Sequence, residues 1–458
     1  MPKNKSNCLH PIDWRYGSKE MKQLFSREKQ LELRLKVEAA IAHAHAQVGN
    51  IPKKAAEEIN KKATIEYVKI NRIDEIEEEI THDIASMVRA LAEQCGEYGQ
   101  YIHLGATSND IIDTAEALRI KEALNIVETR LKTVIEKLIP LAKKHAKTVC
   151  VGRTHGQQAV PYSFGHKVAI WLDELVRHLK NLQRISNTRV YGKLSGAVGT
   201  RAAYGHHADR IVQITMNFLD IKPATISNQL LSREIIAEIF VEPIMLGSSL
   251  DKIATEIRNL QRTEIGELYE PFRSEKQVGS STMSHKRNPE KSERISSLAR
   301  ILRGLTQPLL ENIVTWHERD LANSANERYL YPEVFITIDQ MLLDFIYVLS
   351  GLVVNTERMR ENLEMSNGLI MAEAIMTQLA HNGMDRQKAH ELLRKKSMEA
   401  IAKEKHLHAV LQNDKTVTKY LSPEDLQDLF QHPENYLGTA FEQIEVVVLQ
   451  AQKALSES

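Results

Sequence analysis

The chain has few cysteines and no excess of charge of either sign. Its 458 residues include only Cys8, Cys95 and Cys150, and 60 lysine and arginine residues balance 60 aspartate and glutamate residues. Three cysteines without paired spacing make neither a disulfide framework nor a zinc-ligand pattern, which favours a reducing compartment. Because there is no basic excess, no global electrostatic field favours nucleic acid as a partner. Charge must act locally, at particular sites.

The sequence also lacks a long apolar run. No segment approaches the roughly 20 apolar residues that a membrane span needs, so we expect no membrane association. The N-terminal stretch MPKNKSNCLHPIDWRYG lacks the apolar core of a signal peptide. These absences predict a soluble cytoplasmic protein.

Glycine and proline are scarce, with 20 and 13 residues, and long windows contain neither. In the window 109–139 the apolar residues recur at steps of three and four, which is the period of a helix and not of a strand. These residues are Ile112, Ala115, Leu118, Leu124, Val127, Leu131, Val134, Ile135 and Leu138. At roughly 1.5 Å per residue the helix would be about 45 Å long, and we expect Pro140 to end it. Such a helix must bury its apolar stripe against other long helices.

Similar windows predict four more long helices, and strand-like alternation is nearly absent. They cover residues 166–191, 230–265 with a kink at Pro243, 291–303 and 335–349. The flanking parts of the chain carry shorter helical segments. We therefore predict an all-α fold of three helical domains. They are an N-terminal domain at 1–106, a central long-helix bundle at 107–349 and a C-terminal domain at 350–458.

Two polar clusters precede helices in the first part of the chain. His82 and Asp83 follow the acidic run IDEIEEEI, and a lone histidine there is usually solvated or satisfied in the core. In HLGATSND, Thr107 and Ser108 can cap the next helix, with Asp110 in its first turn. A site that holds a substrate carboxylate with hydroxyl and N–H groups would have the same pattern. The residues alone favour the ordinary N-cap.

A third cluster, GRTHGQQ, places His155 between Thr154 and Gly156, with two glutamines after it. It lies between two predicted long helices, where a side chain is better placed to meet a ligand than to fill a core. Imidazole groups titrate near neutral pH, so His155 is a candidate proton donor or acceptor.

The fourth cluster, VGSSTMSHKRNP, concentrates hydroxyl groups and bases in one loop. Gly279 permits an unusual backbone or a hinge before Ser280, and Pro289 suits the first position of a helix. We expect the N–H groups at that helix start to face a bound anion. A serine hydroxyl becomes a base only if a cation such as Lys286 and N–H groups stabilise its alkoxide away from water. We therefore predict a closing loop that carries a catalytic group.

Spacing excludes two common kinds of site. The loop lacks the Gly-x4-Gly-Lys-Ser/Thr spacing of a phosphate-binding P-loop. No histidines show the paired helical spacing of a zinc protease, and His206, His207, His406 and His408 are typical of surface residues. We expect no metal site.

Three of the clusters together resemble the signatures of the fumarase/aspartase superfamily. GSSTMSHKRNP is similar to its signature loop Gly-Ser-Ser-x-Met-Pro-x-Lys-x-Asn-Pro, and HLGATSND and GRTHGQ are similar to its other two regions. The three occur in the same order as in the superfamily, spread over almost two hundred residues. This combination is far more specific than any one motif.

Further segments resemble one branch of the superfamily, whose members cleave succinylated purine nucleotides. They are WRYGSKEM at 14–21, IEEEITHD at 76–83 and HERDLANSANERYLYPE at 317–333. The resemblance therefore runs from about residue 14 to residue 333, and the C-terminal hundred or so residues carry no recognised motif.

The resemblance implies both an assembly and a reaction. Four chains would form a homotetramer around a twenty-helix core, and each active site would be built from three chains. The reaction would be that of a carbon–nitrogen lyase of purine nucleotide biosynthesis. It would release fumarate from two succinylamino nucleotides, leaving AMP in one case and aminoimidazole carboxamide ribotide in the other. Neither a metal ion nor an organic cofactor is implied.

The resemblance also assigns roles to residues. Ser280 matches the general base, His155 the general acid, His82 a histidine that supports it, and Lys286 a further catalytic residue. The residues expected to bind substrate are Arg15, Tyr16, Thr107, Ser108, Gln229, Asn288, Arg319, Ser324 and Arg328. Those expected at the 5′-phosphate and ribose are Arg15, Tyr16, Arg319, Ser324 and Arg328. Lys286, Asn288, Thr107 and Ser108 would hold the substrate carboxylate, which stabilises the carbanion.

The chain departs from the superfamily pattern at two positions. Ser284 stands where the signature loop usually has proline, which removes a fixed φ from the loop. Glu234 stands where an aspartate usually follows Arg233. Neither change removes a group assigned to chemistry.

Three alternatives remain open. HLGATS also resembles carboxymuconate cycloisomerase, and argininosuccinate lyase performs the same chemistry. Substrates of these two enzymes carry no phosphate, so Arg15, Arg319 and Arg328 argue against them. The third alternative is a non-catalytic helical relative, since a fold does not imply a function. The complete set of candidate catalytic side chains argues against it.

Overall fold

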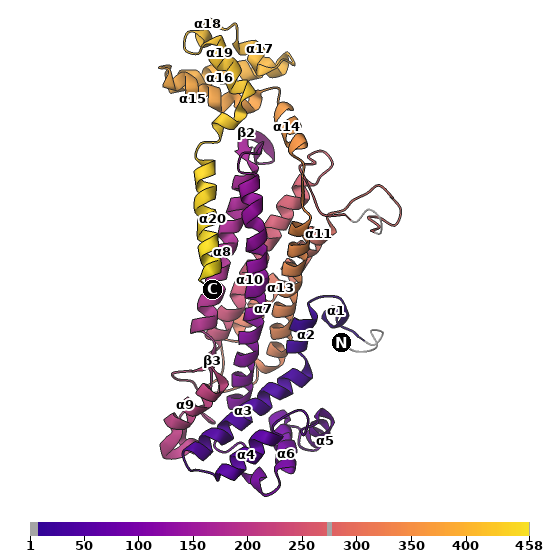
Figure 1. Ribbon diagram of the computed structural model, residues 1–458, viewed down its shortest axis with the longest axis vertical. Coiled ribbons are helices and arrows are strands. Elements are labelled where there is room, and N and C mark those ends of the chain that lie inside the picture. The colour runs from indigo at the N-terminus through magenta and orange to yellow at the C-terminus, as the bar shows by residue number, and fades with distance from the viewer. Residues whose placement is uncertain (1–7, 273–276, 458) are drawn as a thin grey trace. The chain divides into compact units, whose positions relative to one another are not determined.

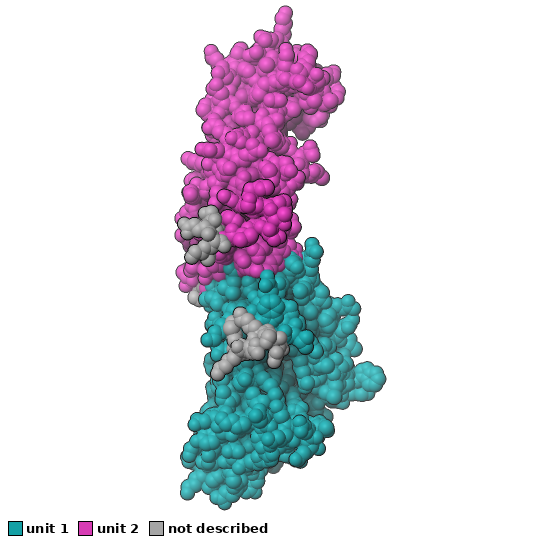
Figure 2. Space-filling view, turned by 90° about the vertical axis from the view of Figure 1, so that its right-hand side faces the viewer, with its two compact units in different colours: residues 1–131, 178–250, 297–343 teal, residues 132–177, 251–296, 344–458 magenta. Residues whose placement is uncertain are grey.

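The computed structural model describes residues 8–272 and 277–457 and is built mainly of helices, with a few short strands (Figure 1). The predicted all-α class is confirmed. The chain divides into two compact units (Figure 2). Unit 1 comprises residues 1–131, 178–250 and 297–343, and unit 2 comprises residues 132–177, 251–296 and 344–458. The three-domain division expected from the sequence stays a prediction.

Five long helices contribute residues to both units. They are α7 (Ser108–Lys144), α8 (Phe164–Thr188), α10 (Arg233–Leu260), α11 (Glu290–Gly304) and α13 (Ser324–Ser350). Each overlaps a window that the apolar period predicts to be helical. Helix α13 begins eleven residues earlier than expected, α8 ends before its window does, and α10 is shorter than its window at both ends. In α7 the predicted apolar stripe is buried from Ala115 to Leu138, and only Ile112 is half-exposed. Burial of these stripes accounts for the length of the helices.

Prolines in the long helices do not end them. The expected stop at Pro140 is wrong, because α7 continues to Lys144. Proline removes one backbone hydrogen bond and crowds the preceding turn. Leu138 and Ala142 on either side are fully buried, so apolar packing offsets that loss. Helix α10 likewise continues through Pro243.

Shorter helices complete unit 1. They are α1 (Pro11–Trp14), α2 (Lys19–Leu24), α3 (Arg27–Gln47), α4 (Lys53–Lys62), α5 (Ile70–Ile80), α6 (Asp83–Cys95), α9 (Ala208–Leu219) and α12 (Thr306–Glu311), with 3₁₀ turns η2 (Gly96–Tyr101) and η3 (Ala202–His207). Helix α3 packs against α4 and α9, and α5 packs against α6. Strands β3 (Tyr191–Gly192) and β4 (Lys222–Pro223) form a short parallel pair.

Unit 2 contains a hairpin that the sequence analysis did not predict. Strands β1 (Val149–Thr154) and β2 (Gln157–Ser163) pair in antiparallel register, with Thr154 opposite Gln157. The two turn residues, His155 and Gly156, both have positive φ, as a two-residue hairpin turn of type I′ requires. A second antiparallel pair joins β5 (Leu268–Tyr269) to β6 (Val353–Val354).

The C-terminal part of unit 2 is a set of helices, and all of them except the last contribute residues to an apolar core. They are α14 (Thr356–Glu364), α15 (Ala372–His381), α16 (Arg386–Ala402), α17 (Leu407–Leu411), α18 (Lys415–Thr418), α19 (Pro423–Gln431) and α20 (Ala440–Ser456), with 3₁₀ turns η4 (Leu369–Met371) and η5 (Pro433–Tyr436). Ile375, Leu379 and Leu407 are fully buried in that core. Among the described helices of both units, none combines the length and apolar character needed to cross a bilayer.

Candidate active site

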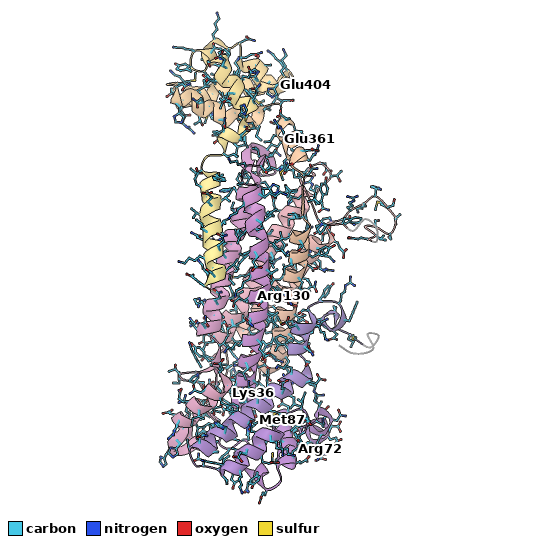
Figure 3. The ribbon with its side chains drawn as sticks, viewed as in Figure 1. Lys36, Arg72, Met87, Arg130, Glu361 and Glu404 are labelled. Carbon is cyan, nitrogen blue, oxygen red and sulfur yellow. The ribbon has the colours of Figure 1, made fainter. Side chains whose placement is uncertain are left out.

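A cavity of about 440 Å³ in unit 1 gathers three of the predicted substrate-binding residues. Arg319, Ser324 and Arg328 all line it, from the start of α13 and the segment before it. Helices α3, α5, α6 and α7 supply most of the other lining residues, and one of these, Met87 of α6, is labelled in Figure 3. The early start of α13 matters here, because it places Ser324 and Arg328 one turn apart on one helix.

The cavity is rich in charge, with six arginines and four carboxylates in its lining. They are Arg27, Arg34, Arg119, Arg233, Arg319 and Arg328, and Glu77, Asp83, Glu116 and Glu327. Several of the arginines are already paired. Arg233 contacts Asp113 at 3.0 Å and Glu327 at 2.8 Å, and Arg119 Nε donates to Glu116 at 2.9 Å. Arg27 pairs with Asp74, which is not one of the lining residues, at 2.9 Å.

Arg319 is one of two cavity arginines that have a buried nitrogen without a hydrogen-bond partner among the described residues. Its Nη1 is buried and has no hydrogen-bond partner among the described residues. Burial lowers the pKa of Arg319, although the nearby Asp113 carboxylate acts in the opposite direction. A guanidinium with free donors suits an anion with several acceptor oxygens, such as a phosphate.

Arg34 of α3 is a cavity residue that the sequence analysis missed. Its side chain is only 14% exposed, lies 3.5 Å from Asp83, and has a buried Nε without a hydrogen-bond partner among the described residues. A signal exists in the sequence, because Leu31, Arg34, Leu35 and Glu38 share one face of α3 at helical spacing. A charge on an apolar stripe needs a partner inside the fold.

His82 lies at the N-cap of α6, next to the cavity residue Asp83. Its Nδ1 accepts the Ala85 backbone N–H at 3.3 Å, and about half of its side chain is exposed. Asp83 lies between Arg34, at 3.5 Å, and Arg328, at 3.8 Å. The structure therefore brings the segment Thr81–Asp83 next to residues that are predicted to bind the phosphate, although His82 itself is not part of the lining as described.

The Thr107–Ser108 turn is held by a buried carboxylate. Asp110 Oδ2 accepts the Thr107 backbone N–H at 3.0 Å, and Asp110 Oδ1 accepts the Ser195 backbone N–H at 2.8 Å. Ser108 is the first residue of α7, so Thr107 directly precedes the helix. The neighbouring Asn109 lines the cavity, so this turn also borders it.

Three further predicted residues lie outside the cavity lining as described. Arg15 is exposed, with its guanidinium 5.8 Å and 5.9 Å from the ring centres of Trp14 and Tyr16. Tyr16 is half-buried, and the backbone beyond it is fixed because Ser18 N donates to Asp339 Oδ2 at 2.7 Å. Gln229 is also half-buried.

In unit 2, His155 occupies the tip of the β1–β2 hairpin. It is exposed and takes a positive φ of 54°, so the imidazole projects from a two-residue turn rather than from a helix. Two residues before it, Arg153 pairs with Glu267 through two hydrogen bonds of 2.6 Å and 3.1 Å. A proton-transfer group at a hairpin tip is accessible and is positioned by the strands below it.

Ser280 lies in the loop between β5 and α11, also in unit 2. Its Oγ accepts the backbone N–H groups of Met283 at 3.0 Å and Thr282 at 3.2 Å. Such donors favour an alkoxide over a hydroxyl group. Lys286 is exposed, and Asn288 Nδ2 donates to the Gly279 carbonyl at 2.9 Å.

Gly279 is required for a steric reason. A Cβ at this position would overlap the carbonyl oxygen of Lys286, so the two backbone segments of the loop approach closely only because residue 279 has no side chain.

The start of α11 does not offer free N–H groups as expected. Glu270 accepts the Ser292 N–H at 2.6 Å and the Lys291 N–H at 3.1 Å. The expectation that this helix start faces a bound anion is wrong for these two groups, because a protein carboxylate already occupies them.

Comparisons with known proteins give a consistent family. Residues 15–304 match a family model described as lyase, and residues 368–447 match one described as adenylosuccinate lyase C-terminus. The second match falls where the sequence analysis recognised no motif. An adenylosuccinate lyase of Pyrococcus abyssi is 51% identical over 96% of this chain and 97% of its own. One of Methanocaldococcus jannaschii is 46% identical over 96% of each chain.

A solved structure with a similar fold belongs to an enzyme with a different activity. The 3-carboxy-cis,cis-muconate lactonizing enzyme of Pseudomonas putida is 30% identical, covers 97% of this chain and 99% of its own, and superposes with a TM-score of 0.88. The fold is thus common to several activities. Two findings distinguish among these activities: the identity to the adenylosuccinate lyases is much higher, and the C-terminal residues match the adenylosuccinate lyase model. The chain therefore belongs to the adenylosuccinate lyase family, within the fumarase/aspartase superfamily.

Proposed function

We propose that this chain removes fumarate from adenylosuccinate to give AMP, and from succinylaminoimidazole carboxamide ribotide to give aminoimidazole carboxamide ribotide. The family membership supports a carbon–nitrogen lyase of purine nucleotide biosynthesis. The observation that carries the substrate class is the arginine-lined cavity with Arg319, Ser324 and Arg328. A phosphorylated substrate needs such a cavity, whereas argininosuccinate and carboxymuconate carry no phosphate.

The elimination breaks one carbon–hydrogen and one carbon–nitrogen bond and forms the double bond of fumarate. Ser280 is proposed to remove the proton next to a substrate carboxylate, and the two N–H groups on its Oγ support this role. His155 is proposed to protonate the departing nitrogen, with His82 supporting it. Lys286 would stabilise the negative charge that develops.

The remaining predicted residues are proposed to bind substrate. Arg319 and Arg328 would form charge-assisted hydrogen bonds with the phosphate. The Nη1 of Arg319, which has no partner within residues 8–272 and 277–457, supports this. Ser324, Arg15 and Tyr16 would complete the phosphate and ribose side. Thr107, Ser108, Asn288 and Gln229 would hold the succinyl part and its carboxylates. No cofactor has a role in this scheme.

We further propose that the chain acts as a cytoplasmic homotetramer with a twenty-helix core and shared active sites. Exposed apolar side chains in and around α12 and α13 support an interface, since a soluble monomer rarely leaves many together. They include Val314, Trp316, Leu321 and Tyr329, each at least 70% exposed. Analytical ultracentrifugation would test the assembly.

The experiment for the reaction is a turnover assay. Purified protein is mixed with adenylosuccinate, and release of fumarate and AMP is followed. We expect the wild type to release fumarate and AMP in equal amounts. Ser280→Ala and His155→Ala should each reduce this release strongly while the variant still binds the substrate. Argininosuccinate and carboxymuconate serve as rival substrates under the same conditions. Turnover of either rival with none of adenylosuccinate would refute the proposal, and an undiminished Ser280→Ala or His155→Ala rate would refute that residue's role.

A further inference from the structure

One short segment of unit 2 contacts both the hairpin that carries His155 and the loop that carries Ser280. The segment runs from Gln261 to Glu270 and includes strand β5. Its two carboxylates, Glu267 and Glu270, are buried, with 1% and 8% of their surface exposed. Buried carboxylates are stable only when hydrogen-bond donors surround them. Their donors come from the hairpin, from Asn362 of α14 and from the first turn of α11, which follows the Ser280 loop.

Glu267 holds the hairpin just below its tip. Arg153 Nη2 donates to Glu267 Oε1 at 2.6 Å, Arg153 Nη1 donates to Oε2 at 3.1 Å, and Asn362 Nδ2 donates to Oε1 at 2.7 Å. Gln158, which faces Arg153 across the hairpin, donates to the Asn362 carbonyl at 3.2 Å. Both strands are therefore fixed at one rung. Only Thr154, Gln157 and the two turn residues lie beyond it.

Gln261 holds the end of the Ser280 loop, and Glu270 holds the first turn of α11, into which the loop leads. Glu270 accepts the N–H groups of Lys291 and Ser292 and the Ser292 hydroxyl, at 3.1, 2.6 and 2.5 Å. Gln261 Nε2 donates to the Arg287 carbonyl at 3.1 Å, and Gln261 Oε1 accepts the Glu270 N–H at 2.9 Å. Arg287 lies between Lys286 and Asn288, so the contact reaches the residues expected to hold the substrate carboxylate.

We propose that Glu267 and Glu270 are positioning residues for the elimination. Glu267 fixes the height and direction of the turn that presents His155, and Glu270 fixes the end of the loop that presents Ser280. The inference rests on the proposed function, because it assigns these carboxylates to the acid and the base of that reaction. Displacement of a reacting group by about 1 Å can cost on the order of 100-fold in rate.

The test uses Glu267→Gln and Glu270→Gln, which keep the size of each side chain and remove its charge. Each variant is expected to lower kcat by about 10- to 100-fold. The KM for adenylosuccinate should change less than kcat in both variants, because the arginine-lined cavity proposed to bind the phosphate belongs to unit 1. Arg153→Lys, which keeps the charge but loses the two-point contact, should reproduce part of the Glu267→Gln effect.

Amide hydrogen exchange separates positioning from general instability. Glu267→Gln should speed exchange at residues 154–158 and leave residues 279–289 unchanged, and Glu270→Gln should do the reverse. The control is Glu242→Gln in unit 1, which removes an equally buried carboxylate that contacts His178 at 2.6 Å. Its exchange at both segments and its kcat should match the wild type even if its melting temperature falls.

Each result decides one question. An inactive wild type refutes the proposed function, while the exchange pattern still tests the anchoring. An active wild type whose Glu267→Gln variant keeps its kcat overturns the role of Glu267, and the same holds for Glu270. Equal kcat losses in Glu242→Gln, or faster exchange at both segments in every variant, would show a merely structural role and overturn the inference.

Discussion

Lys193 Nζ lies 2.7 Å from Asp110 Oδ1, and both side chains are completely buried. Asp110 also accepts hydrogen bonds from the backbone of Thr107 and Ser195 and from the Tyr204 hydroxyl at 3.1 Å. Two ions leave water at a cost of several kcal/mol each, which their attraction offsets only when the remaining lone pairs are satisfied. Here several donors satisfy them, so the pair fastens the Thr107 turn to the segment that follows β3.

Removing one member of this pair should be costly. Lys193→Met leaves the Asp110 carboxylate buried without a counter-ion, and we expect a loss of about 3–5 kcal/mol in the free energy of unfolding. The measurement is urea-induced unfolding at matched protein concentration. Lys121→Met is the control, because Lys121 forms an exposed pair with Asp220 at 3.0 Å and should lose no more than about 1 kcal/mol. Similar small losses in both variants would contradict the prediction.

The pair formed by the buried Glu38 and the partly buried His103 should make stability depend on pH. The His103 Nδ1 lies 2.7 Å from Glu38 Oε1. Burial lowers the pKa of His103, but the hydrogen bond and the charge of Glu38 outweigh it, and the pKa is raised above its ordinary value. A raised histidine pKa stabilises the fold fully below the unfolded value of about 6.5, and this contribution is lost as pH rises through the folded value.

The prediction is tested with His103→Gln. The melting temperature of the wild type should exceed that of the variant most at pH 6, and the difference should shrink steadily towards pH 9. A difference that stays constant over this range would show that the charge on His103 contributes nothing.

The three cysteines should differ in reactivity. Burial raises the pKa of the Cys95 thiol to about 11 and that of Cys150 to about 12, whereas Cys8 is partly exposed. The thiolate is the reactive species. At pH 8, Ellman's reagent should therefore modify one thiol per native chain quickly, and Cys8→Ser should abolish that phase. All three should react in guanidinium chloride. A second fast thiol in the native protein would contradict the burial of Cys95 or Cys150.

The long helices could be predicted from the sequence because an apolar period repeated over many turns has one simple solution. Their ends could not. Proline at 140 is a local penalty, and whether the helix continues depends on what Ala142 packs against, which a single sequence does not contain. The hairpin was missed for a related reason. Its positive-φ turn uses His155 followed by Gly156, and the histidine was interpreted only as a chemical group.

Some residues of the candidate site could likewise be predicted from the sequence, and others could not. Residues within motifs, such as Ser280 and His155, could be named because the motif carries the chemistry. Arg34 and Glu267 could not, since each depends on a partner far away in the sequence. Glu267 meets Arg153 across 114 positions. Such pairs become visible only when the chain is folded, and here they determine how the named residues are held.

Replacing Arg319 should stabilise the free protein but weaken substrate binding. Its Nη1 is buried and has no partner in the part of the chain that the structure describes, so the free protein carries a desolvation cost that a bound phosphate would relieve. Arg319→Met should therefore raise the melting temperature of the free protein, and it should raise the KM for adenylosuccinate about 10- to 100-fold with a smaller change in kcat.

Arg328→Met should raise KM less, because about two-thirds of the Arg328 side chain is exposed. Arg27→Met is the matched control in the same cavity, since Arg27 is already paired with Asp74 and its loss should leave KM within about twofold. An Arg319→Met variant with an unchanged KM would remove this residue from the phosphate site, and one with a raised KM but a lower melting temperature would show that its guanidinium is satisfied in the free protein.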